Sequence, residues 1–288
     1  TYFLRQLRRR NLKLSQIGHE FELRESRSAL SKFFVRAYAA AYEEFSIIFF
    51  HARENRDRFH SLFPHIPRER TFVIPHGNSG WLLKKSPGPD GVNMLRQKYG
   101  LAPQEPVVLF FGLLAPSKGL EDLVEAFAIA RRTCEAKLLI VGYPTKHIDM
   151  DALRTRIAAS GLTGDVILDP RYIPLNEVGP LMELATVVVY PYRSSTQSGA
   201  LQVAYTFGRP VIASAIGGLP EAVDDGQSGL LTPPEVPAAL AEKILIMIQD
   251  PARAARMGEY ARRLSETRFS WKSVAKQIVE ICSKSLNP

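Results

Sequence analysis

The chain has 288 residues, 45% of them hydrophobic and 23% charged, which is the composition of a soluble globular protein with more than one core. No apolar run reaches the roughly 20 residues that span a bilayer, so a membrane-spanning protein is not predicted. Lys and Arg (37) exceed Asp and Glu (29), and the net charge of +8 attracts nucleotides, acidic lipids or other polyanions without selecting among them.

Cysteine and histidine usage argues against a metal site. Cys134 and Cys282 are the two cysteines, and their spacing suits neither a disulfide framework nor a redox or zinc motif. The six histidines are not spaced with carboxylates or cysteines as a zinc site requires. We therefore predict no metal cofactor and a location in the reducing cytoplasm. Because no nucleic-acid-binding module accompanies the positive charge, nucleic acid is not predicted as a partner.

The first third of the chain is basic and begins with a predicted helix at Tyr2–Arg10. This helix combines Phe3 with several arginines. It either makes peripheral contact with the anionic inner face of the cell membrane or is an ordinary helix whose basic face is solvated. Strands are then predicted at Leu12–Ile17, Ser46–Phe50 and Thr71–Ile74, with helices through Ala29–Phe45 and Ala52–Phe63 between them. This alternation predicts part of a parallel α/β domain.

The first of these strands ends in Gly18-His19-Glu20. Ligands of parallel sheets bind outside the carboxyl ends of the strands, so His19 and Glu20 are candidates for ligand contact. A capped histidine in an ordinary loop is the alternative. His76 is open to the same two interpretations, as a ligand contact or as part of the turn at Gly77.

A segment rich in proline and glycine, Lys84–Gly91, has the composition of an interdomain linker. It predicts a partial amino-terminal domain at 1–85 and a second domain at 86–269. The end of the chain, 270–288, is predicted to be a helix that packs on the first domain.

Residues 106–232 alternate between strand and helix patterns. Strands are predicted near 107–112, 137–142, 166–169, 187–191, 210–213 and 229–232, with helices between them and further helices at 236–249, 251–267 and 271–284. Strict alternation of this kind is typical of a doubly wound parallel sheet.

The segment Gln197-Ser198-Gly199-Ala200-Leu201 lies between a predicted strand and a predicted helix. A glycine that opens a helix at the end of a strand presents unpaired backbone N–H groups where the helix dipole is positive, and this suits a phosphate or diphosphate. The alternative is an ordinary strand-to-helix turn in which Ser198 only caps the helix.

Two further loops support the phosphate interpretation. Lys118 follows the strand at 107–112, where a flexible ammonium group reaches the same crevice, although a solvated surface lysine has the same pattern. Gly217-Gly218-Leu219-Pro220-Glu221 is another helix start, in which Glu221 either orients a sugar hydroxyl or only favours the helix dipole.

Several stretches together resemble one known enzyme family. They are Val73–Asn78, Phe110–Gly112, Lys118–Leu120, Tyr190–Arg193, Thr196–Gly199, Gly208–Ala213 and Gly217–Glu221. In their order and spacing the chain resembles the retaining glycosyltransferases of family 4, and Thr-Gln-Ser-Gly resembles one branch of that family. The resemblance implies the α/β GT-B fold of two facing Rossmann-like domains with parallel sheets, the first one incomplete here because its opening strand and glycine-rich loop are missing.

The resemblance also implies a function, namely transfer of a sugar from a nucleotide diphosphate sugar to a glycan or lipid-linked acceptor in polysaccharide biosynthesis, with retention at the anomeric carbon and without a metal. It implies catalytic roles for Lys118 and for His19, which would touch the acceptor or the transferred sugar. Arg171-Tyr172-Ile173 would lie near the base. The implied donor-binding residues are Gly112, Lys118, Arg171, Tyr172, Gln197, Ser198, Gly199, Ala200, Leu201 and Glu221.

The chain departs from the family pattern at three places. Ser195 and Val203 stand where the family commonly carries two glutamates, and Leu113-Leu114-Ala115 replaces a stretch that usually holds an arginine. These replacements predict reduced activity, and they keep open a non-catalytic nucleotide-sugar-binding or partner protein. A GT-B epimerase acting on a nucleotide sugar shares the architecture but not this set of motifs.

Overall fold

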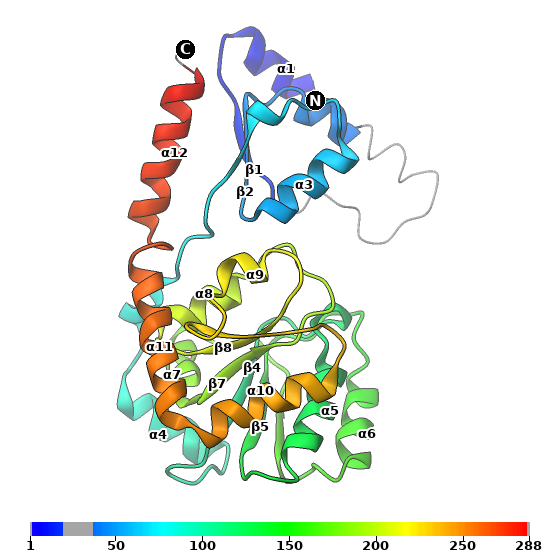
Figure 1. Ribbon diagram of the computed structural model, residues 1–288, viewed down its shortest axis with the longest axis vertical. Helices are drawn as coiled ribbons and strands as arrows, with labels where there is room; N and C mark the ends of the chain where they lie inside the picture. The colour runs from blue at the N-terminus through cyan, green and yellow to red at the C-terminus, as the bar shows by residue number, and fades with distance from the viewer. Residues whose placement is uncertain (1, 20–36, 287–288) are drawn as a thin grey trace. The chain divides into compact units, whose positions relative to one another are not determined.

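A computed structural model describes residues 2–19 and 37–286 and divides into two compact units (Figure 1). Unit 1 contains the described residues up to His76 together with the last helix, α12 (Trp271–Leu286). Unit 2 is Gly77–Ser270. The chain therefore passes between the units twice, after His76 and after Ser270.

The boundary between the units differs from the predicted one at residue 85. Lys84–Gly91, predicted as a linker, lies inside unit 2, where it ends the 3-10 helix η2 (Gly80–Lys85) and begins α4 (Pro89–Lys98). Gly88 is the N-cap of α4 with a φ of +68°, and Pro89 takes the first helical position. The two residues therefore begin a helix and do not form a flexible linker. Gly91 is packed closely, because an added Cβ would lie 2.6 Å from a ring carbon of Pro180.

Unit 1 is built on a three-stranded parallel sheet in the order β1 (Ser15–Ile17), β2 (Ile47–Phe50), β3 (Thr71–Val73). Its helices are α1 (Tyr2–Arg9), α3 (Arg53–Leu62), the short η1 (Arg68–Arg70) and α12, and residues 37–42 are also helical. The strand at β1 is shorter than the predicted Leu12–Ile17. Glu20 and the first part of the predicted helix at 29–45, residues 29–36, lie outside the described residues.

The central strand β2 is buried on both faces because its side chains alternate between two apolar layers. On one face, Ile48 and Phe50 pack with Phe59 and Phe63 from α3 and the loop after it. On the other face lie Ile47 and Phe49 with apolar residues of α12, namely Val274, Ile278, Ile281 and Cys282. The last helix of the chain therefore completes the core of the first unit.

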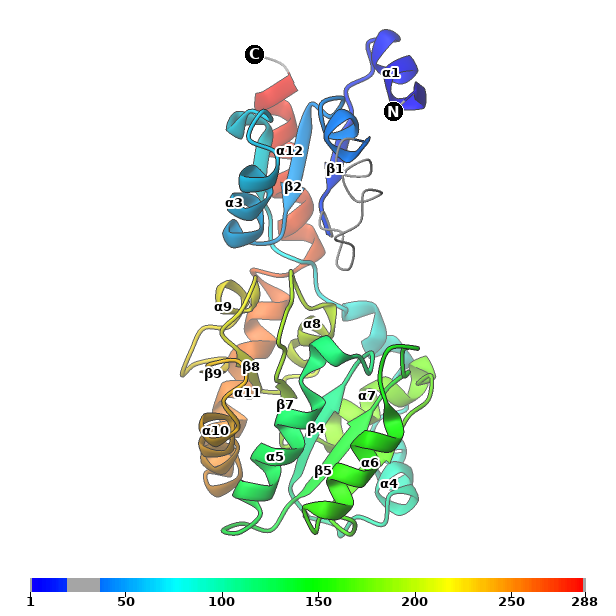
Figure 2. The same ribbon diagram turned by 90° about the vertical axis from the view of Figure 1, so that its right-hand side faces the viewer.

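Unit 2 contains a six-stranded parallel sheet in the order β6-β5-β4-β7-β8-β9 (Figure 2). Its strands are β4 (Val107–Phe111), β5 (Lys137–Val141), β6 (Val166–Asp169), β7 (Val187–Tyr190), β8 (Val211–Ser214) and β9 (Gly229–Thr232). After η2 and α4, the unit contains the short 3-10 helix η3 (Pro116–Lys118). Its further α-helices are α5 (Leu120–Ala130), α6 (Met150–Ala159), α7 (Leu175–Leu184), α8 (Gly199–Thr206), α9 (Leu219–Ala222), α10 (Pro237–Gln249) and α11 (Pro251–Glu266). The predicted doubly wound sheet is confirmed.

The strand order of unit 2 reverses direction at β4, since β5 and β6 continue on one side of it and β7, β8 and β9 on the other. In open parallel sheets, ligands bind outside the carboxyl ends of the strands at such a switch point. The strands other than β6 are almost wholly buried. A ligand site is therefore expected at the loops after β4, β7 and β8.

Candidate functional site

The loops after β4, β7 and β8 are tied to one another by backbone hydrogen bonds. The amide of Arg193, after β7, donates to the carbonyl of Ser117, after β4, at 3.0 Å. The amide of Gly218, after β8, donates to the carbonyl of Thr196 at 3.1 Å. These bonds join three stretches that are distant in sequence into one rim at the carboxyl end of the sheet.

Helix α8 begins at this rim. Ser198 is its N-cap, and its Oγ accepts from the amide of Leu201 at 3.2 Å, so the capping role weighed in the sequence analysis is present. The amides of Gly199 and Ala200 belong to the same first turn, and among the described residues neither has a hydrogen-bond acceptor. The side chain of Gln197 turns back to accept from the amide of Ser198 at 2.9 Å. Capping and anion binding are thus compatible here, because the cap uses one amide and leaves two.

Gly112 lies opposite the start of α8, at the end of β4. Its backbone has a φ of +149°, and an added Cβ would lie 3.9 Å from the Cβ of Ala200. The positive φ favours glycine at this position, and the distance of 3.9 Å is that of an ordinary van der Waals contact. Leu201, predicted in the same group, is fully buried and faces the core instead.

Lys118 ends η3, and its ammonium group lies 3.7 Å from the centre of the Tyr192 ring. A cation over the face of an aromatic ring is held in place by electrostatic attraction. Tyr192 is buried, and its hydroxyl is 3.4 Å from the Oγ of Ser198, the N-cap of α8. Burial raises the pKa of Tyr192 to about 12, so the ring stays neutral. Tyr192 therefore links Lys118 to the helix start.

The contact between Lys118 and Tyr192 was not predicted from the sequence. The available signal was an aromatic residue directly after a buried strand, on the same side of the sheet as a lysine. That pattern is common in cores and does not by itself indicate support for a charged group.

Arg193 is a second cation near this rim, and it is paired with carboxylates. Its guanidinium donates to both carboxylate oxygens of Asp122 at 2.7 and 2.8 Å. Glu121 and Glu235 lie within ion-pair distance as well, at 3.4 and 3.6 Å. The hydrogen bonds to Asp122 raise the pKa of Arg193 further against the cost of partial burial. Arg193 therefore fixes the loop after β7 to the start of α5.

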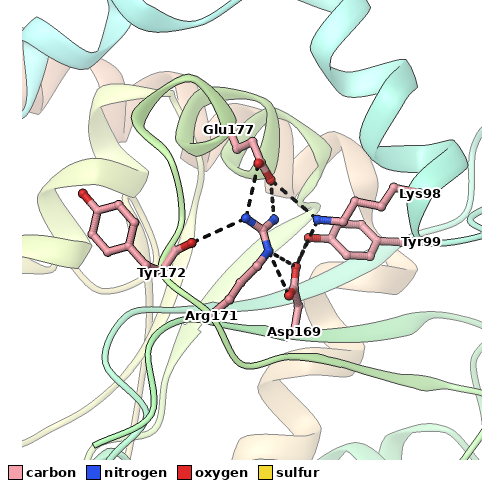
Figure 3. A network of polar contacts seen from close by, with 6 residues as sticks. All are labelled: Lys98, Tyr99, Asp169, Arg171, Tyr172 and Glu177. Carbon is pink, nitrogen blue, oxygen red and sulfur yellow. Dashed lines mark hydrogen bonds and ion pairs between the residues drawn. The ribbon is translucent and has the colours of Figure 1, made fainter.

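Arg171 stands at the centre of a polar network at the carboxyl end of β6 (Figure 3). Its Nε donates to both oxygens of Asp169 at 3.0 Å, and its two terminal nitrogens contact the carboxylate of Glu177 on α7. From α4, Tyr99 donates to Asp169 at 2.7 Å, and Lys98 lies 3.3 Å from the same oxygen. Arg171, predicted as a donor ligand, is thus occupied by carboxylates in this structure.

The carboxyl group of Asp169 titrates below its usual range. Burial alone would raise its pKa, but the hydrogen bonds from Tyr99 and Arg171 and the charges of Arg171 and Lys98 outweigh burial and lower it. The same pairing raises the pKa of Arg171, through Glu177 first. Asp169 therefore stabilises the folded state above its unfolded-state pKa, and this contribution is lost as the pH falls through the lower folded-state value.

Replacing Arg171 by alanine is expected to lower the free energy of unfolding by about 2 kcal/mol near neutral pH, because it leaves two half-buried carboxylates without their main partner. The difference from the unchanged protein should shrink below about pH 4, where Asp169 becomes protonated in the unfolded state and then in the folded state. Urea unfolding at several pH values measures this, with Arg154→Ala on the exposed face of α6 as the control. A difference that does not change with pH would contradict the ionic account.

The remaining predicted donor residues lie at the same end of the sheet. Tyr172, the residue after Arg171, is 70% exposed. Its carbonyl oxygen accepts from Nη1 of Arg171 at 3.5 Å. Glu221 lies in the first turn of α9, and its carbonyl accepts from Arg268. Leu113 belongs to the stretch 113–115, where the resemblance implies an arginine, and its side chain is 56% exposed. A neutral side chain therefore stands where a second cation was expected.

Ser195 and Val203, at the positions of the family glutamates, have local roles. The Ser195 hydroxyl donates to the carbonyl of Gln197 at 3.1 Å, and Val203 is buried in α8. The carbonyl of Ser195 also lies close to Gly217, where an added Cβ would come within 1.7 Å of it. Both residues thus support the loops and carry no carboxylate into the site.

His19 lies in unit 1, where it forms part of a cluster of three histidines. These residues follow β1, β2 and β3: the ring centres of His19 and His51 are 4.8 Å apart, and those of His51 and His76 are 4.9 Å apart. His19 is exposed, whereas His51 is buried and donates from Nδ1 to the carbonyl of Ile74 at 3.2 Å. The predicted ligand-side histidines therefore gather at the carboxyl ends of the three strands of unit 1.

His51 is expected to stay neutral throughout the physiological range. Burial lowers its pKa to about 4, and the neighbouring His76 and His19 act in the same direction. In the unfolded chain the pKa of this histidine is higher, near 6.5. Protons therefore bind the unfolded state more tightly than the folded state. The free energy of unfolding of unit 1 should fall by up to about 3 kcal/mol as the pH drops from 6.5 to 4. The pKa of His51 in the folded protein is measured by following the imidazole proton shifts with pH by NMR. A titration midpoint near 6.5 for His51 would show that the ring is not buried as described.

The described residues contain neither a candidate metal site nor a candidate membrane span. Across 2–19 and 37–286, no group of three or more His, Cys, Asp and Glu side chains is placed to hold a metal ion. Within the same residues, no helix has both the length and the apolar character that a bilayer crossing requires.

Residues 105–250 match the protein family described as glycosyl transferases group 1. The chain is 33% identical over 224 residues to the D-inositol 3-phosphate glycosyltransferase of Nocardia farcinica, covering 76% of this chain and 48% of that protein. It is 29% identical over 247 residues to a GDP-mannose-dependent alpha-(1-6)-phosphatidylinositol monomannoside mannosyltransferase of Mycolicibacterium smegmatis, covering 82% of this chain and 62% of that one. The match thus spans about half to three fifths of the length of these curated relatives.

Solved structures show the same fold. HepE from Anabaena in complex with UDP superposes with a TM-score of 0.82 at 23% identity, covering 98% of this chain and 75% of that one. Sucrose-phosphate synthase from Thermosynechococcus elongatus superposes with a TM-score of 0.81 at 24% identity, covering 99% of this chain and 71% of that one. Neighbours of this kind are GT-B glycosyltransferases, so the predicted fold class is confirmed for both α/β units.

Proposed function

The chain belongs to the glycosyl transferases group 1 family, and we propose from this that it moves a sugar from a nucleotide diphosphate sugar to a glycan or lipid-linked acceptor. One observation carries the proposal: Lys118 and the first turn of α8 meet through Tyr192 at the carboxyl end of the sheet. The proposed donor contacts are the amides of Gly199 and Ala200 and the ammonium group of Lys118.

This arrangement suits the departure of a nucleoside diphosphate. When the bond between the anomeric carbon and the phosphate oxygen breaks, the electron pair stays on the phosphate, and negative charge grows there. Fixed amide dipoles at a helix N-terminus and an ammonium group stabilise such charge without having to reorganise. We therefore propose that the reaction needs no metal ion. Retention at the anomeric carbon and membership of the Thr-Gln-Ser-Gly branch are part of the same proposal and rest on the motif resemblance.

The base of the donor is proposed to lie against the exposed ring of Tyr172, at the end of β6. The network around Arg171 holds the backbone of this turn through Asp169 and Glu177, which gives the base a rigid edge. On the acceptor side we propose His19, which is exposed at the end of β1. The UDP complex of HepE and the GDP-mannose named for the mycobacterial relative support a nucleotide sugar as donor without deciding the base.

We also propose that the protein binds peripherally to the cytoplasmic face of the cell membrane. In α1, Tyr2 and Phe3 are 76% and 70% exposed, whereas Arg5 pairs with Glu44 of the same unit at 3.0 Å. Exposed aromatic side chains next to arginines suit peripheral contact with anionic lipid. Sedimentation with vesicles tests this part: binding to anionic but not to neutral vesicles is expected, and equal recovery with both would remove it.

A second candidate function is a non-catalytic protein that binds a nucleotide sugar. It is favoured by Ser195, Val203 and the stretch Leu113-Leu114-Ala115, because two family glutamates and an arginine of the family pattern are replaced there. Such a protein would use the same α8 amides and Lys118 to hold a diphosphate, but it would not turn the donor over.

Calorimetric titration with a panel of uridine and guanosine diphosphate sugars, followed by assays for hydrolysis and transfer, separates the two functions. Binding with turnover is expected from the transferase, and binding without hydrolysis or transfer would establish the second candidate. No binding of any diphosphate sugar, by a protein that is shown to be folded, would refute both.

A further inference from the structure

Arg209 is a partly buried cation at the opposite end of the sheet from the proposed donor site. It stands between Gly208 and Pro210, directly before β8, and thus at the amino ends of the strands. Its Nη1 donates to the carbonyl of Ala185 at 3.1 Å. Its Nε is buried, and among the described residues it has no acceptor. A guanidinium in such a place is costly unless a partner satisfies it.

The charges around Arg209 do not neutralise it. Burial lowers the pKa of Arg209, the charge of Glu183 opposes that effect in part, and the charge of Arg262 adds to it. Glu183 is near enough to act through its charge, yet no ion pair joins it to Arg209 within the described part of the chain. Arg262 directs its own Nε toward Glu266 on the surface of α11, at 3.4 Å. Two guanidinium groups and one carboxylate therefore border the same space.

That space is a cavity of about 460 Å³ in unit 2. Arg209, Arg262, Glu183 and Asn93 supply its polar lining. Leu83, Val92 and Phe207 supply apolar walls from η2, α4 and the end of α8. A volume of this size lies in the range of small-molecule sites, which are mostly apolar and carry a few placed polar groups.

The wall that carries the two arginines is held rigidly. At Gly258 of α11, an added Cβ would lie 2.2 Å from the carbonyl oxygen of Gly208, so the helix and the turn before Arg209 are in close contact. The side chain of Arg262 packs over the same turn, because an added Cβ at Gly208 would lie 3.7 Å from its Cδ. The backbone before Arg209 and the aliphatic part of Arg262 are therefore held together by packing.

We propose that this cavity is a second ligand site, for a small organic anion whose head group pairs with Arg209 and Arg262 and whose apolar body rests on Leu83, Val92 and Phe207. An anionic head would accept hydrogen bonds from the guanidinium groups of Arg209 and Arg262 and would add negative charge beside them. The site lies at the amino ends of β7 and β8, whereas the proposed donor site lies at the carboxyl ends of β4, β7 and β8. The second site is thus independent of the proposed transferase function.

Calorimetric titration of the whole chain with phenyl phosphate, with inorganic phosphate and with phenol tests the proposal. Phenyl phosphate is expected to bind at least tenfold more tightly than either the head or the body alone. Arg209→Gln should weaken this binding at least tenfold and Arg262→Gln about threefold, since a charge-assisted hydrogen bond is lost in each. Arg154→Gln, an exposed arginine of α6, should leave it unchanged.

The variants also separate this cavity from the donor site. If phenyl phosphate binds at the amino ends of the strands, Lys118→Ala leaves its affinity unchanged. Loss of binding in Lys118→Ala, or equal binding by the unchanged chain and the folded Arg209→Gln variant, overturns the proposal. Circular dichroism shows whether Arg209→Gln is folded; if it is not, the exposed Arg262→Gln decides, and unchanged affinity in that variant also overturns the site.

Discussion

Lys118→Ala is expected to slow sugar transfer by about 100- to 1000-fold, the cost of one preorganised contact to developing charge, about 2.7–4 kcal/mol. The same change should weaken binding of a nucleoside diphosphate about 10- to 100-fold, because a charge-assisted hydrogen bond is lost. Binding of the nucleoside alone should not change. Steady-state kinetics and calorimetry with the two ligands measure these effects.

The control for Lys118 is Lys84→Ala, which removes an exposed lysine of the same unit and should leave both affinities unchanged. The geometry explains the expected size of the effect: the ammonium group lies over the ring of Tyr192, which in turn reaches the cap of α8, so the charge is already in place before a ligand arrives. Equal loss of affinity for the nucleoside and the nucleoside diphosphate would mean that Lys118 does not act on phosphate.

Gly119→Ala is expected to destabilise unit 2 by at least about 3 kcal/mol, more than a left-handed backbone alone would cost. Gly119 has a φ of +64°, and an added Cβ would lie 2.0 Å from the carbonyl oxygen of Pro191. The loops after β4 and β7 would have to separate to make room. Because the residue follows Lys118 directly, donor binding should weaken as well.

Gly100→Ala is a matched control for this change. Gly100 has nearly the same φ, +63°, but an added Cβ there meets nothing within 4 Å. Its cost should therefore be about 1–2 kcal/mol, the strain of a left-handed residue. Urea unfolding of the two variants gives the difference, and if both lose the same amount, the close approach of the two loops is not what requires Gly119.

Much of unit 2 was predictable because its elements leave a local record. The run Val107–Phe111 is continuous and apolar, as expected of a strand covered on both faces, and the alternation with helices indicated parallel pairing before any contact was known. Ser198 before a helix and Gly199 at its first position likewise indicated the turn at α8. The family followed from the order and spacing of several such turns, and the match over residues 105–250 confirms it at the level of group 1 glycosyltransferases.

Other features depended on residues that only the tertiary structure brings together. The linker prediction at Lys84–Gly91 rested on composition, but proline and glycine also begin helices, and the contact of Gly91 with Pro180 decides between the two. Arg171 carries the same charge whether it is free for a ligand or held by Asp169 and Glu177, so sequence could not distinguish these states.

The amino-acid sequence by itself therefore determined the strands of unit 2, the start of α8 and the family to which the chain belongs, because burial and backbone geometry act on neighbouring residues. The tertiary structure alone decided that Tyr192 supports Lys118 and that Arg209 borders a cavity with Arg262. Each of these depends on strand order and helix packing, which place distant residues within a few ångströms of one another and leave no local pattern in the chain.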